Sequence, residues 1–586
     1  MSGETLQPNG WAALRLPNDN LKILQIVPHT TISLGKYGSF PSNLIIERPF
    51  NLTYEVQDRL EGETFSRLRV VSAAELNADA LADTTGDVAA AAEAEAAENG
   101  TGSDDTGEDE ELTLVDQSSG QVVARSKREL LLDESARQKL TPAEIEELKR
   151  KGASAGHDLI AKLLLSHTAI EQKTGYSLAK YKLLKTKKYI RRFTVLPLDV
   201  PLLAHWMLED RDAAKILEMR QESMALVGCW SDVHFTPPPA KGAQGPHAGR
   251  WLVVDDTAGL LTASLAERMG ILHPKPDQDD QDDQTSQLED TTTTTTTTTA
   301  DVPLRQQEQQ QQPGEEVKAV TAARSNSKRR IDDLEIPYAP NNSLTIIHHN
   351  SQPNLSVLRY FDFDHSDINP SPPYHPLFTN LTSLSWLQLV APEEDPAYAD
   401  APAEVDAETL ASWKTNQRGN YHRKRRRWAR TKHIVDTTLA GGFSGLAVAS
   451  TMDPVSILRH TLPLLAGGAP IAIYSQTVEP LSQLADCFSV GRRAGWVANP
   501  PPETVGQSTA ELERWAGNEE FPINPTLLLG ASVQTSRARR WQVLPQRTHP
   551  LMTERGGAEG YIFTGWRAVP VEGKIEARGK FRRKRA

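Results

Sequence analysis

The sequence predicts a two-domain α/β protein, in which a β-rich, barrel-like N-terminal domain precedes a Rossmann-like domain. Short β-branched and aromatic runs, separated by Gly and Pro, dominate the first part of the chain and indicate strands. From residue 251 onward, apolar runs alternate with helical segments, which is typical of a mostly parallel sheet covered on both faces. We expect the domains to span 1–196 and 197–573, followed by a basic tail at 574–586.

The N-terminal domain is expected to close as a small β-barrel or a strongly curved sheet. Helices should follow its strands, and the first of them begins with the capping sequence Thr141-Pro142-Ala143-Glu144. The expected strands are 21–27, 31–40, 43–56, 68–72, 111–117 and 192–196, and the expected helices are 141–152, 155–169 and 177–189.

The C-terminal domain shows apolar strand runs followed by helical segments. Its tail, LLLGASVQTS and then YIFTGWRAV, predicts two final antiparallel strands. The remaining expected strands are 251–255, 343–349, 385–390, 445–450 and 470–475, and the expected helices are 259–269, 353–360, 454–465 and 478–488.

Three low-complexity inserts interrupt these domains, at 73–111, 275–333 and 392–432. Their polar composition cannot bury enough apolar surface to offset chain entropy, which predicts disordered loops. Tracts in these inserts hold 27 acids and no Lys or Arg, so the net charge of −12 hides a basic remainder of 49 acids against 64 bases. That remainder, at +15, indicates a partner with a phosphate backbone.

The cysteine content and the apolar runs indicate an intracellular protein. Cys229 and Cys487 provide neither a disulfide framework nor a metal quartet. The N-terminal MSGETLQPNG lacks the features of a secretory signal. The longest mostly apolar stretch, Leu439–Ala449, is far shorter than the ~20 residues of a membrane span. We therefore expect neither a metal site nor a membrane.

The first strand of the C-terminal domain ends at the place where a Rossmann-like fold binds its cofactor. The run Trp251–Val254 ends in Asp255, and a helix begins near Gly259. An acid-x-Gly-x-Gly-x-Gly loop starting at Asp255 would place glycines at 257, 259 and 261, because the backbone must turn tightly beside the ligand. Thr257 and Leu261 occupy two of those positions. We therefore expect a degenerate loop that binds no cofactor.

Two further strand ends lack the side chains that an active enzyme needs. Adenine-modifying methyltransferases place an acid before a Pro-rich step, and Ser450 stands at that position here. Asp453 directly precedes Pro454 and reads better as a helix N-cap. After strand 343–349, where a carboxylate should meet ribose hydroxyls, His348 and His349 stand instead. We expect no catalytic residue in this chain.

The segment KYKLLKTKKYIRRF, residues 180–193, is the strongest RNA-binding candidate. Clustered cations repel unless an anion lies close, and RNA phosphates provide one. Leu184 is expected to face the core. The alternative is a solvated helix face with aromatic ends packed inward. The candidate contacts are Lys180, Tyr181, Lys185, Lys187, Lys188, Arg191 and Arg192.

A second basic segment, RARRWQVLPQRTHPLM, covers residues 537–552. Arginines can fork onto phosphates and stack on bases, but Arg and Trp also anchor subunit interfaces, and both interpretations stay open. RKRRR at 423–427 and RGKFRRKRA at 578–586 are candidate nuclear import signals or nucleic-acid arms, or simply solvated charge. The candidate RNA contacts here are Arg537, Arg540, Arg547 and His549.

The chain resembles the family of non-catalytic, RNA-binding subunits of the eukaryotic tRNA (adenine-58-N1)-methyltransferase. The resemblance extends over most of the chain outside the inserts, in the same order. It is carried by LGKYGSFPSNLIIERPFNLTYEV, RQKLTPAEIEELKRKGASAGHDLIAKLL, KTGYSLAKYKLLKTKKYIRRFTV, GLLTASLAERMG, WQVLPQRTHPLM and GYIFTGW.

The resemblance implies a degenerate class I methyltransferase fold derived from a duplicated ancestor. It further implies that S-adenosylmethionine binds the catalytic paralogue and that two copies of each subunit form a heterotetramer holding tRNA. With the candidate import signals at 423–427 and 578–586, we expect the protein in the nucleus. The changes at Thr257, Leu261 and Ser450 agree with a non-catalytic role. Two alternatives stay open: an active methyltransferase with an atypical cofactor loop, and a general RNA-binding scaffold.

Overall fold

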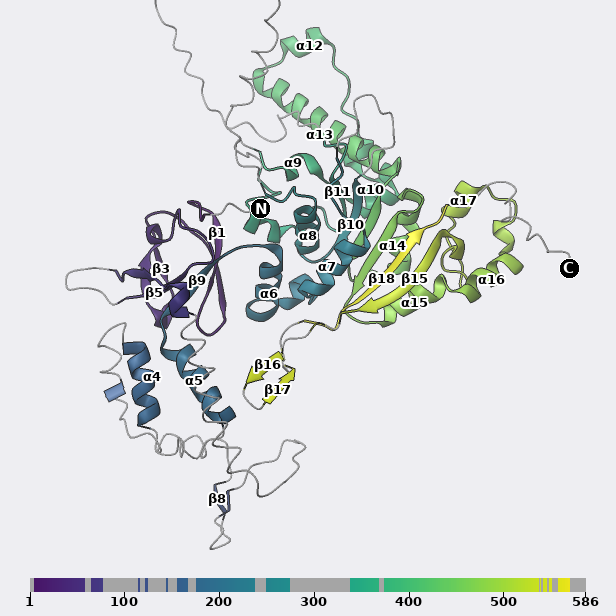
Figure 1. Ribbon diagram of the computed structural model, residues 1–586. Helices are drawn as coiled ribbons and strands as arrows, with labels where there is room; N and C mark the ends of the chain where they lie inside the picture. The colour runs from purple at the N-terminus through teal and green to yellow at the C-terminus, as the bar shows by residue number, and fades with distance from the viewer. Residues whose placement is uncertain are drawn as a thin grey trace, which may run out of the picture.

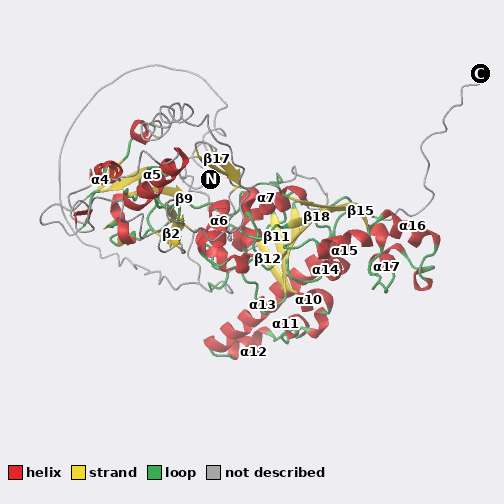
Figure 2. Cartoon of the chain, turned by 90° about the horizontal axis from the view of Figure 1, so that it is seen from below, coloured by secondary structure: helices red, strands yellow, loops and turns green. Residues whose placement is uncertain are grey.

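The computed structural model shows two sheet-based domains joined by helices (Figure 1). The C-terminal domain is the larger one, and Figure 2 shows its helices extending beyond the sheet that contains β11 (Ser343–His348) and β18 (Tyr561–Arg567). The structure describes residues 5–57, 65–76, 114–115, 122–124, 144–145, 155–166, 175–237, 249–273, 338–367, 374–536, 538, 541–544, 547–550 and 557–569.

Within these ranges, the N-terminal domain is built on a five-stranded antiparallel sheet in the order β2–β1–β9–β5–β6. β2 and β6 lie at opposite edges of this sheet and are not paired with each other, so closure into a barrel is not confirmed. The strands are β1 (Trp11–Arg15), β2 (Leu21–Gln25), β5 (Thr53–Val56), β6 (Leu68–Val70) and β9 (Arg192–Pro197), and a separate hairpin pairs β3 (Thr31–Ser33) with β4 (Ser39–Pro41).

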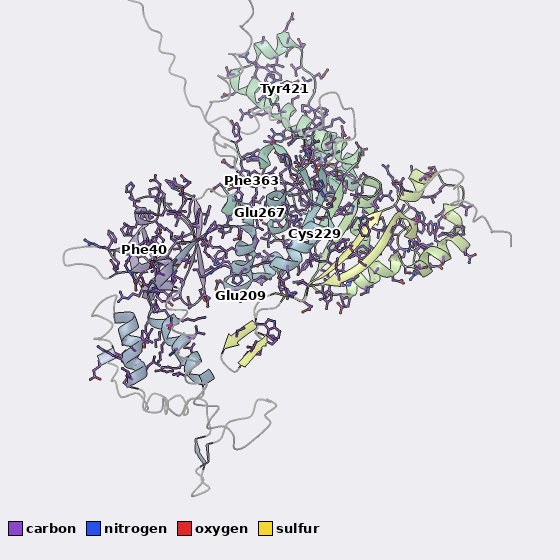
Figure 3. The ribbon with its side chains drawn as sticks, viewed as in Figure 1. Phe40, Glu209, Cys229, Glu267, Phe363 and Tyr421 are labelled. Carbon is purple, nitrogen blue, oxygen red and sulfur yellow. The ribbon has the colours of Figure 1, made fainter. Side chains whose placement is uncertain are left out.

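An aromatic cluster fills the core of this domain. Phe40 from the β3–β4 hairpin, labelled in Figure 3, stacks on Phe193 of β9 at 4.9 Å between ring centroids, and Tyr54 of β5 also stacks on Phe193, at 5.5 Å. All three side chains are buried. The hairpin therefore folds back onto the sheet, because its aromatic side chain gains more by burial there than in water.

Helices pack beside this sheet as the sequence predicts. α4 (Ala155–Leu165) and α5 (Gly175–Tyr189) match the expected second and third helices. The expected helix at 141–152 and the insert at 73–111 lie largely outside the described residues. A short hairpin pairs β7 (Leu114–Val115) with β8 (Val122–Ala124).

Two helices, α6 (Val200–Asp210) and α7 (Gln221–Trp230), follow β9 and lead into the second domain. Trp11 of the first sheet lies edge-on to Tyr360 at 4.9 Å, and Trp206 of α6 contacts the same ring at 5.8 Å. Ala13 and Leu21 of the first sheet join the buried cluster of the second domain, whereas the aromatic cluster around Phe40 and Phe193 forms a separate core. The domains are thus packed against each other rather than tethered.

Among the described residues, the C-terminal domain contains a seven-stranded sheet in the order β12–β11–β10–β13–β14–β18–β15. The first five strands are parallel, and β18 runs antiparallel to both of its neighbours. This order is Rossmann-like, with β10 at the point where the strand order reverses. The bounds are β10 (Arg250–Asp255), β11 (Ser343–His348), β12 (Leu381–Ser385), β13 (Gly445–Ala449), β14 (Pro470–Ser475), β15 (Leu528–Thr535) and β18 (Tyr561–Arg567).

Both faces of this sheet are covered, because alternate side chains of each central strand point into different cores. Trp251 and Val253 of β10 face the core with α6, α7 and α8 (Leu260–Arg268), whereas Leu252 and Val254 face α14 (Pro454–Thr461) and α15 (Glu479–Cys487). The predicted strands 251–255, 445–450 and 470–475 and the final antiparallel pair are confirmed. Segment 353–360 forms a 3₁₀ helix, η6 (Ser356–Phe361), rather than an α-helix.

The predicted strand at 385–390 is wrong. Ser385 ends β12 and caps α10 (Trp386–Val390), with its side chain accepting from the Gln388 N–H while the Gln388 side chain accepts from the Ser385 N–H. This reciprocal capping box begins a helix where the apolar run alone suggested a strand.

The prediction of disorder for 392–432 is also wrong. The segment forms η7 (Pro392–Glu394), α11 (Pro396–Ala399), α12 (Ala407–Ser412) and most of the 25-residue α13 (Thr415–Leu439). Tertiary contacts support it, among them a hydrogen bond from the Trp428 Nε1–H to the Tyr398 carbonyl at 2.9 Å. The insert 275–333 and the tail 574–586 lie outside the described residues.

Two remaining expectations concern membranes and metals. No described helix combines the length and apolarity needed to cross a membrane. In the described part of the chain, no three His, Cys, Asp or Glu side chains form a group able to hold a metal ion. Cys229 is exposed and Cys487 is buried, and both are free thiols.

Candidate nucleic-acid interface

The carboxylate of Asp255, at the end of β10, is hydrogen-bonded by the loop and helix that follow it. Asp255 is buried and, within the described residues, accepts four hydrogen bonds. Thr257 donates its N–H and hydroxyl to one oxygen at 2.7 and 2.6 Å, and Thr262 donates the same pair to the other at 2.9 and 2.6 Å. Burial raises the pKa of Asp255, and these donors oppose the rise. The carboxylate is therefore saturated by its own loop and helix.

The segment around Leu355 and Val357 packs against the rest of this loop. Gly259 has φ of +92°, and a Cβ atom there would lie 3.1 Å from the Cα of Leu355. The Val357 N–H also donates to the Ala258 carbonyl at 3.0 Å. Leu261 is fully buried. The one retained glycine thus accommodates the protein's own backbone at a point where a cofactor loop would approach its ligand.

The adjacent strand ends are tied to one another. Ser450, after β13, donates its hydroxyl to Asp256 at 2.5 Å, and His349 approaches the same carboxylate at 3.4 Å. His348 pairs through Nδ1 with the Asn350 carbonyl at 2.7 Å, and burial lowers its pKa. Asp453 caps α14 by accepting from the Ser456 N–H at 2.9 Å, as predicted.

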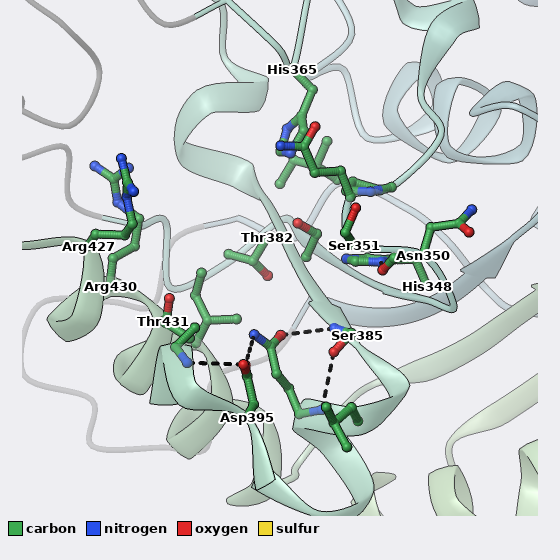
Figure 4. Close-up of a pocket in the computed structure, with 18 of the residues that line it drawn as sticks. His348, Asn350, Ser351, His365, Thr382, Ser385, Asp395, Arg427, Arg430 and Thr431 are labelled. Carbon is green, nitrogen blue, oxygen red and sulfur yellow. Dashed lines mark hydrogen bonds between the residues drawn. The ribbon is translucent and has the colours of Figure 1, made fainter. Parts of the chain in front are cut away.

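A pocket of about 730 Å³ opens beside the ends of β11 and β12 (Figure 4). Arg427 and Arg430 of α13 lie together on one side of it, and His348 and His365 lie on the other (Figure 4). Asp395 lines it too, but its carboxylate already accepts from the Gln388 side chain at 2.7 Å and the Ala397 N–H at 3.0 Å. The sequence does not reveal this pocket, because Arg427 and Arg430 belong to the segment 392–432, which was expected to be disordered.

The basic segment predicted to contact RNA forms α5 and the start of β9. α5 carries five lysines and no acid. Lys185 lies 4.7 Å above the Tyr181 ring and Lys188 lies 5.5 Å from the Tyr189 ring centroid. Lys187 forms an ion pair with Asp19 at 2.5 Å. The side chain of Lys180 is outside the described part of the structure.

One expectation about this segment is wrong, and another residue of the segment is tied to the sheet. Leu184 does not face the core, because it is 56% exposed, whereas Ile190, the residue that follows α5, is buried. The side chain of Arg192 is only 11% exposed and forms an ion pair with Glu75 at 2.6 Å. This ion pair ties Arg192 to the sheet, and its contact with RNA stays a prediction.

The second basic segment forms a hairpin of β16 (Trp541–Leu544) and β17 (Arg547–Pro550). Although far from α5 in sequence, β16 lies beside it (Figure 1). His549 is partly exposed, and its Nδ1 pairs with the Pro550 carbonyl at 2.8 Å. Arg537, Arg540 and the side chain of Arg547 lie outside the described residues. The fold thus brings together two segments that the sequence showed only as separate basic runs.

Comparison with known proteins gives consistent names. Residues 5–414 match the model of the Gcd10p family. The chain is 40% identical to the tRNA (adenine(58)-N(1))-methyltransferase non-catalytic subunit of Aspergillus fumigatus, covering 99% of this chain and 95% of that protein. It is 41% identical to the subunit of the same name from Aspergillus oryzae, with the same coverage, and 23% identical to that of Schizosaccharomyces pombe, covering 98% and 95%.

Solved structures give looser likenesses. A SAM-dependent O-methyltransferase from Thermotoga maritima is 8% identical with a TM-score of 0.36, covering 97% of each chain. The tRNA (m1A58) methyltransferase TrmI from Aquifex aeolicus is 7% identical with a TM-score of 0.33, covering 96% of this chain and 98% of that one.

Proposed function

The chain belongs to the Gcd10p family, and we propose that it works as the non-catalytic, tRNA-binding subunit of a tRNA (adenine-58-N1)-methyltransferase. It is not itself an enzyme. Its task is to bind tRNA and to position it for a catalytic partner. No residue of this chain is assigned a role in methyl transfer.

The closed loop after β10 is the observation that carries this proposal. A cofactor bound at the switch point of the sheet needs room above the loop and a carboxylate able to accept new hydrogen bonds. Asp255 already accepts from Thr257 and Thr262, and Leu355 packs on Gly259. These contacts fit a degenerate site, and we place S-adenosylmethionine on the catalytic partner.

The basic surface of α5 supports the tRNA-binding role. A base that lies inside folded RNA must be exposed before its ring nitrogen can be methylated, and this costs a few kcal/mol. Contacts between lysines and phosphates away from the reacting base supply binding energy that can offset this cost. Lys185 and Lys188 stand on a helix without acids and are suited to this grip.

The β16–β17 hairpin supports a partner surface beside α5. Trp541 is 57% exposed and Val543 is 73% exposed, and exposed apolar side chains on a two-stranded hairpin are typical of an interface. We propose that this hairpin packs against the catalytic subunit and that two copies of each subunit assemble. The basic surface of α5 would then lie beside the partner, because β16 contacts α5.

We propose the nucleus as the site of action. The support is the basic tail RGKFRRKRA at 578–586, which is typical of an import signal. A fluorescent fusion should lose nuclear accumulation when these nine residues are removed. Unchanged accumulation would refute the role of the tail.

Methyl transfer to unmodified tRNA tests the main proposal. It is measured with this chain alone, with its catalytic paralogue alone, and with both together. Activity confined to the mixture and mapped to adenine 58 is expected. Methyl transfer by this chain alone would overturn the non-catalytic assignment, and full activity of the paralogue alone would show that no RNA-binding subunit is needed.

A further inference from the structure

α13 is a basic helix that extends outward from the C-terminal domain (Figures 1 and 2). Its 25 residues span about 37 Å and carry eight Lys or Arg against one acid, Asp436. In this fully described helix, the buried side chains are Val435 and Thr438, both near its C-terminal end. The charged N-terminal part therefore stands clear of the sheet, with Tyr421 at its outer end (Figure 3).

One face of α13 is held by the segment that precedes it. The Tyr421 hydroxyl donates to the Ala403 carbonyl at 3.2 Å, and the Trp428 Nε1–H donates to the Tyr398 carbonyl at 2.9 Å. Asp436 accepts from the Tyr398 hydroxyl at 2.9 Å. Positions 421, 428 and 436 repeat at seven- and eight-residue intervals, which places them on one side of a helix. The acid of the helix thus lies on this supported face.

Four arginines occupy the other side. Arg423, Arg426, Arg427 and Arg430 follow the spacing i, i+3, i+4, i+7, which puts them on a common face. We call these four residues the arginine stripe. Four guanidinium groups on one face of a helix concentrate positive charge there, and a partner with a phosphate backbone matches such a charge.

The stripe leads into the pocket at the ends of β11 and β12. Arg427 and Arg430 line one side of that pocket, and Thr382 lies between them and His348 (Figure 4). Guanidinium groups match the oxygens of a phosphate with forked hydrogen bonds. A cationic sulfonium compound would be repelled here, and the carboxylate that ribose hydroxyls need is replaced by His348 at the end of β11. The chemistry of the pocket therefore suits an anion.

We propose that the arginine stripe and this pocket bind phosphate groups of the RNA backbone. This inference rests on the proposed function, because it names a second contact for the same tRNA. α13 and α5 belong to different domains and lie well apart in both views (Figures 1 and 2). Two separate contacts with one folded RNA, one at α5 and one at α13, bind more tightly than either alone, because the second contact forms at a high effective concentration.

Charge removal on the two sides of α13 tests the proposal. The stripe variant is R423Q/R426Q/R427Q, and the matched control is R418Q/K424Q/R425Q, which removes the same charge from the opposite side of the same helix. Both are assembled with the catalytic subunit, and co-purification and thermal unfolding verify the complex. tRNA affinity is measured by titration at several salt concentrations.

The stripe variant should bind tRNA about tenfold more weakly at moderate salt, with a salt slope smaller by about two. The control should stay within about twofold of the unmodified complex, since it leaves every stripe residue in place. Equal losses in both variants would overturn the proposal in favour of general electrostatics. Normal tRNA affinity in both, with reduced nuclear accumulation in both, would overturn it in favour of an import signal read along the linear sequence.

A second measurement distinguishes failure of the arginine-stripe proposal from failure of the proposed function. Adenine-58 methylation by the unmodified mixture is measured in the same preparations. If that activity is present while the stripe and control variants bind tRNA equally well, only the stripe proposal fails. If the unmodified mixture neither binds nor methylates tRNA, the proposed function fails as well.

Discussion

Thr262 holds Asp255 with two hydrogen bonds, from its backbone N–H at 2.9 Å and from its hydroxyl at 2.6 Å. The first turn of α8 is therefore fastened to the end of β10 by a buried carboxylate. In a cofactor-binding domain this is where loop and helix together receive a ligand. Here the same groups satisfy each other's hydrogen bonds, so this loop and helix stabilise the fold.

Asp255→Ala should accordingly lower the free energy of unfolding by about 3 kcal/mol, because it leaves buried donors of Thr257 and Thr262 without an acceptor. Chemical denaturation of the purified chain measures this loss. Asp400→Ala, at an exposed position, serves as the control and should change stability by less than about 0.5 kcal/mol. An Asp255→Ala protein as stable as the control would show that the network is not structural.

Strands with a strong local signal could be predicted from the sequence, whereas strands that depend on tertiary contacts could not. The parallel strands β10, β13 and β14 were predictable, because uninterrupted apolar runs are typical of strands buried on both faces. β1 was not, because Trp11-Ala-Ala-Leu-Arg15 is a weak strand signal and its pairing with β9 joins residues more than 170 positions apart. That pairing is visible only in the folded chain.

The candidate site was predictable in part, for the same reason. The presence of Thr257 and Leu261 where a cofactor loop needs glycine could be read directly, because a loop motif is local. The arginine stripe could not, since charge density alone indicates disorder and α13 gains order from Trp428 and Tyr398. A helical spacing of arginines within the run was the signal that could have revealed it.

A pH dependence of stability follows from His375. This buried imidazole accepts from the Leu377 N–H at 3.1 Å and pairs with the Phe361 carbonyl at 3.2 Å, and burial lowers its pKa from 6.5 to about 4. Between pH 6.5 and 4 the unfolded chain therefore binds a proton that the folded chain does not. Stability is full above pH 6.5 and falls as the pH drops towards 4, by about 3 kcal/mol for this group.

Denaturation of unmodified and His375→Gln chains at pH 7, 5.5 and 4.5 measures this dependence. The variant should be less stable at pH 7, since it disturbs a buried site, but should lose less stability on acidification. Burial also lowers the pKa of His348 and His365, so a residual slope of the same sign is expected in the variant. Parallel pH profiles of the two chains would contradict the role of His375.

Substitution of Arg192 is expected to lower the stability of the chain without changing its affinity for tRNA. Arg192→Gln removes a nearly buried partner of Glu75 and should reduce the free energy of unfolding by about 2 kcal/mol. The folded fraction should still bind tRNA with normal affinity. Urea denaturation and tRNA titration on the same preparation check both statements, and a stable protein with weakened binding would return Arg192 to the RNA interface.

The opposite pattern is expected for Lys187 and Lys188. Lys187→Glu with Lys188→Glu reverses two charges near the end of α5 and should weaken tRNA binding by the complex about tenfold at moderate salt. The ion pair with Asp19 lies at the surface, so its loss should cost at most about 1 kcal/mol. Lys36→Glu with Lys215→Glu is the matched control. Unchanged affinity of the α5 variant would remove this helix from the RNA interface.

The last prediction concerns the β16–β17 hairpin, where exposed Trp541 and Val543 allow two explanations. If the hairpin is a subunit interface, Trp541→Ala with Val543→Ser removes apolar anchors and should abolish co-purification with the catalytic subunit. The isolated chain should unfold at its normal temperature, because neither side chain is buried within it. If the hairpin instead stacks on RNA, the complex should assemble normally and bind tRNA more weakly. Gel filtration of the mixed subunits, followed by tRNA titration of the assembled fraction, distinguishes these outcomes, and only the first agrees with our assignment of the hairpin to the partner.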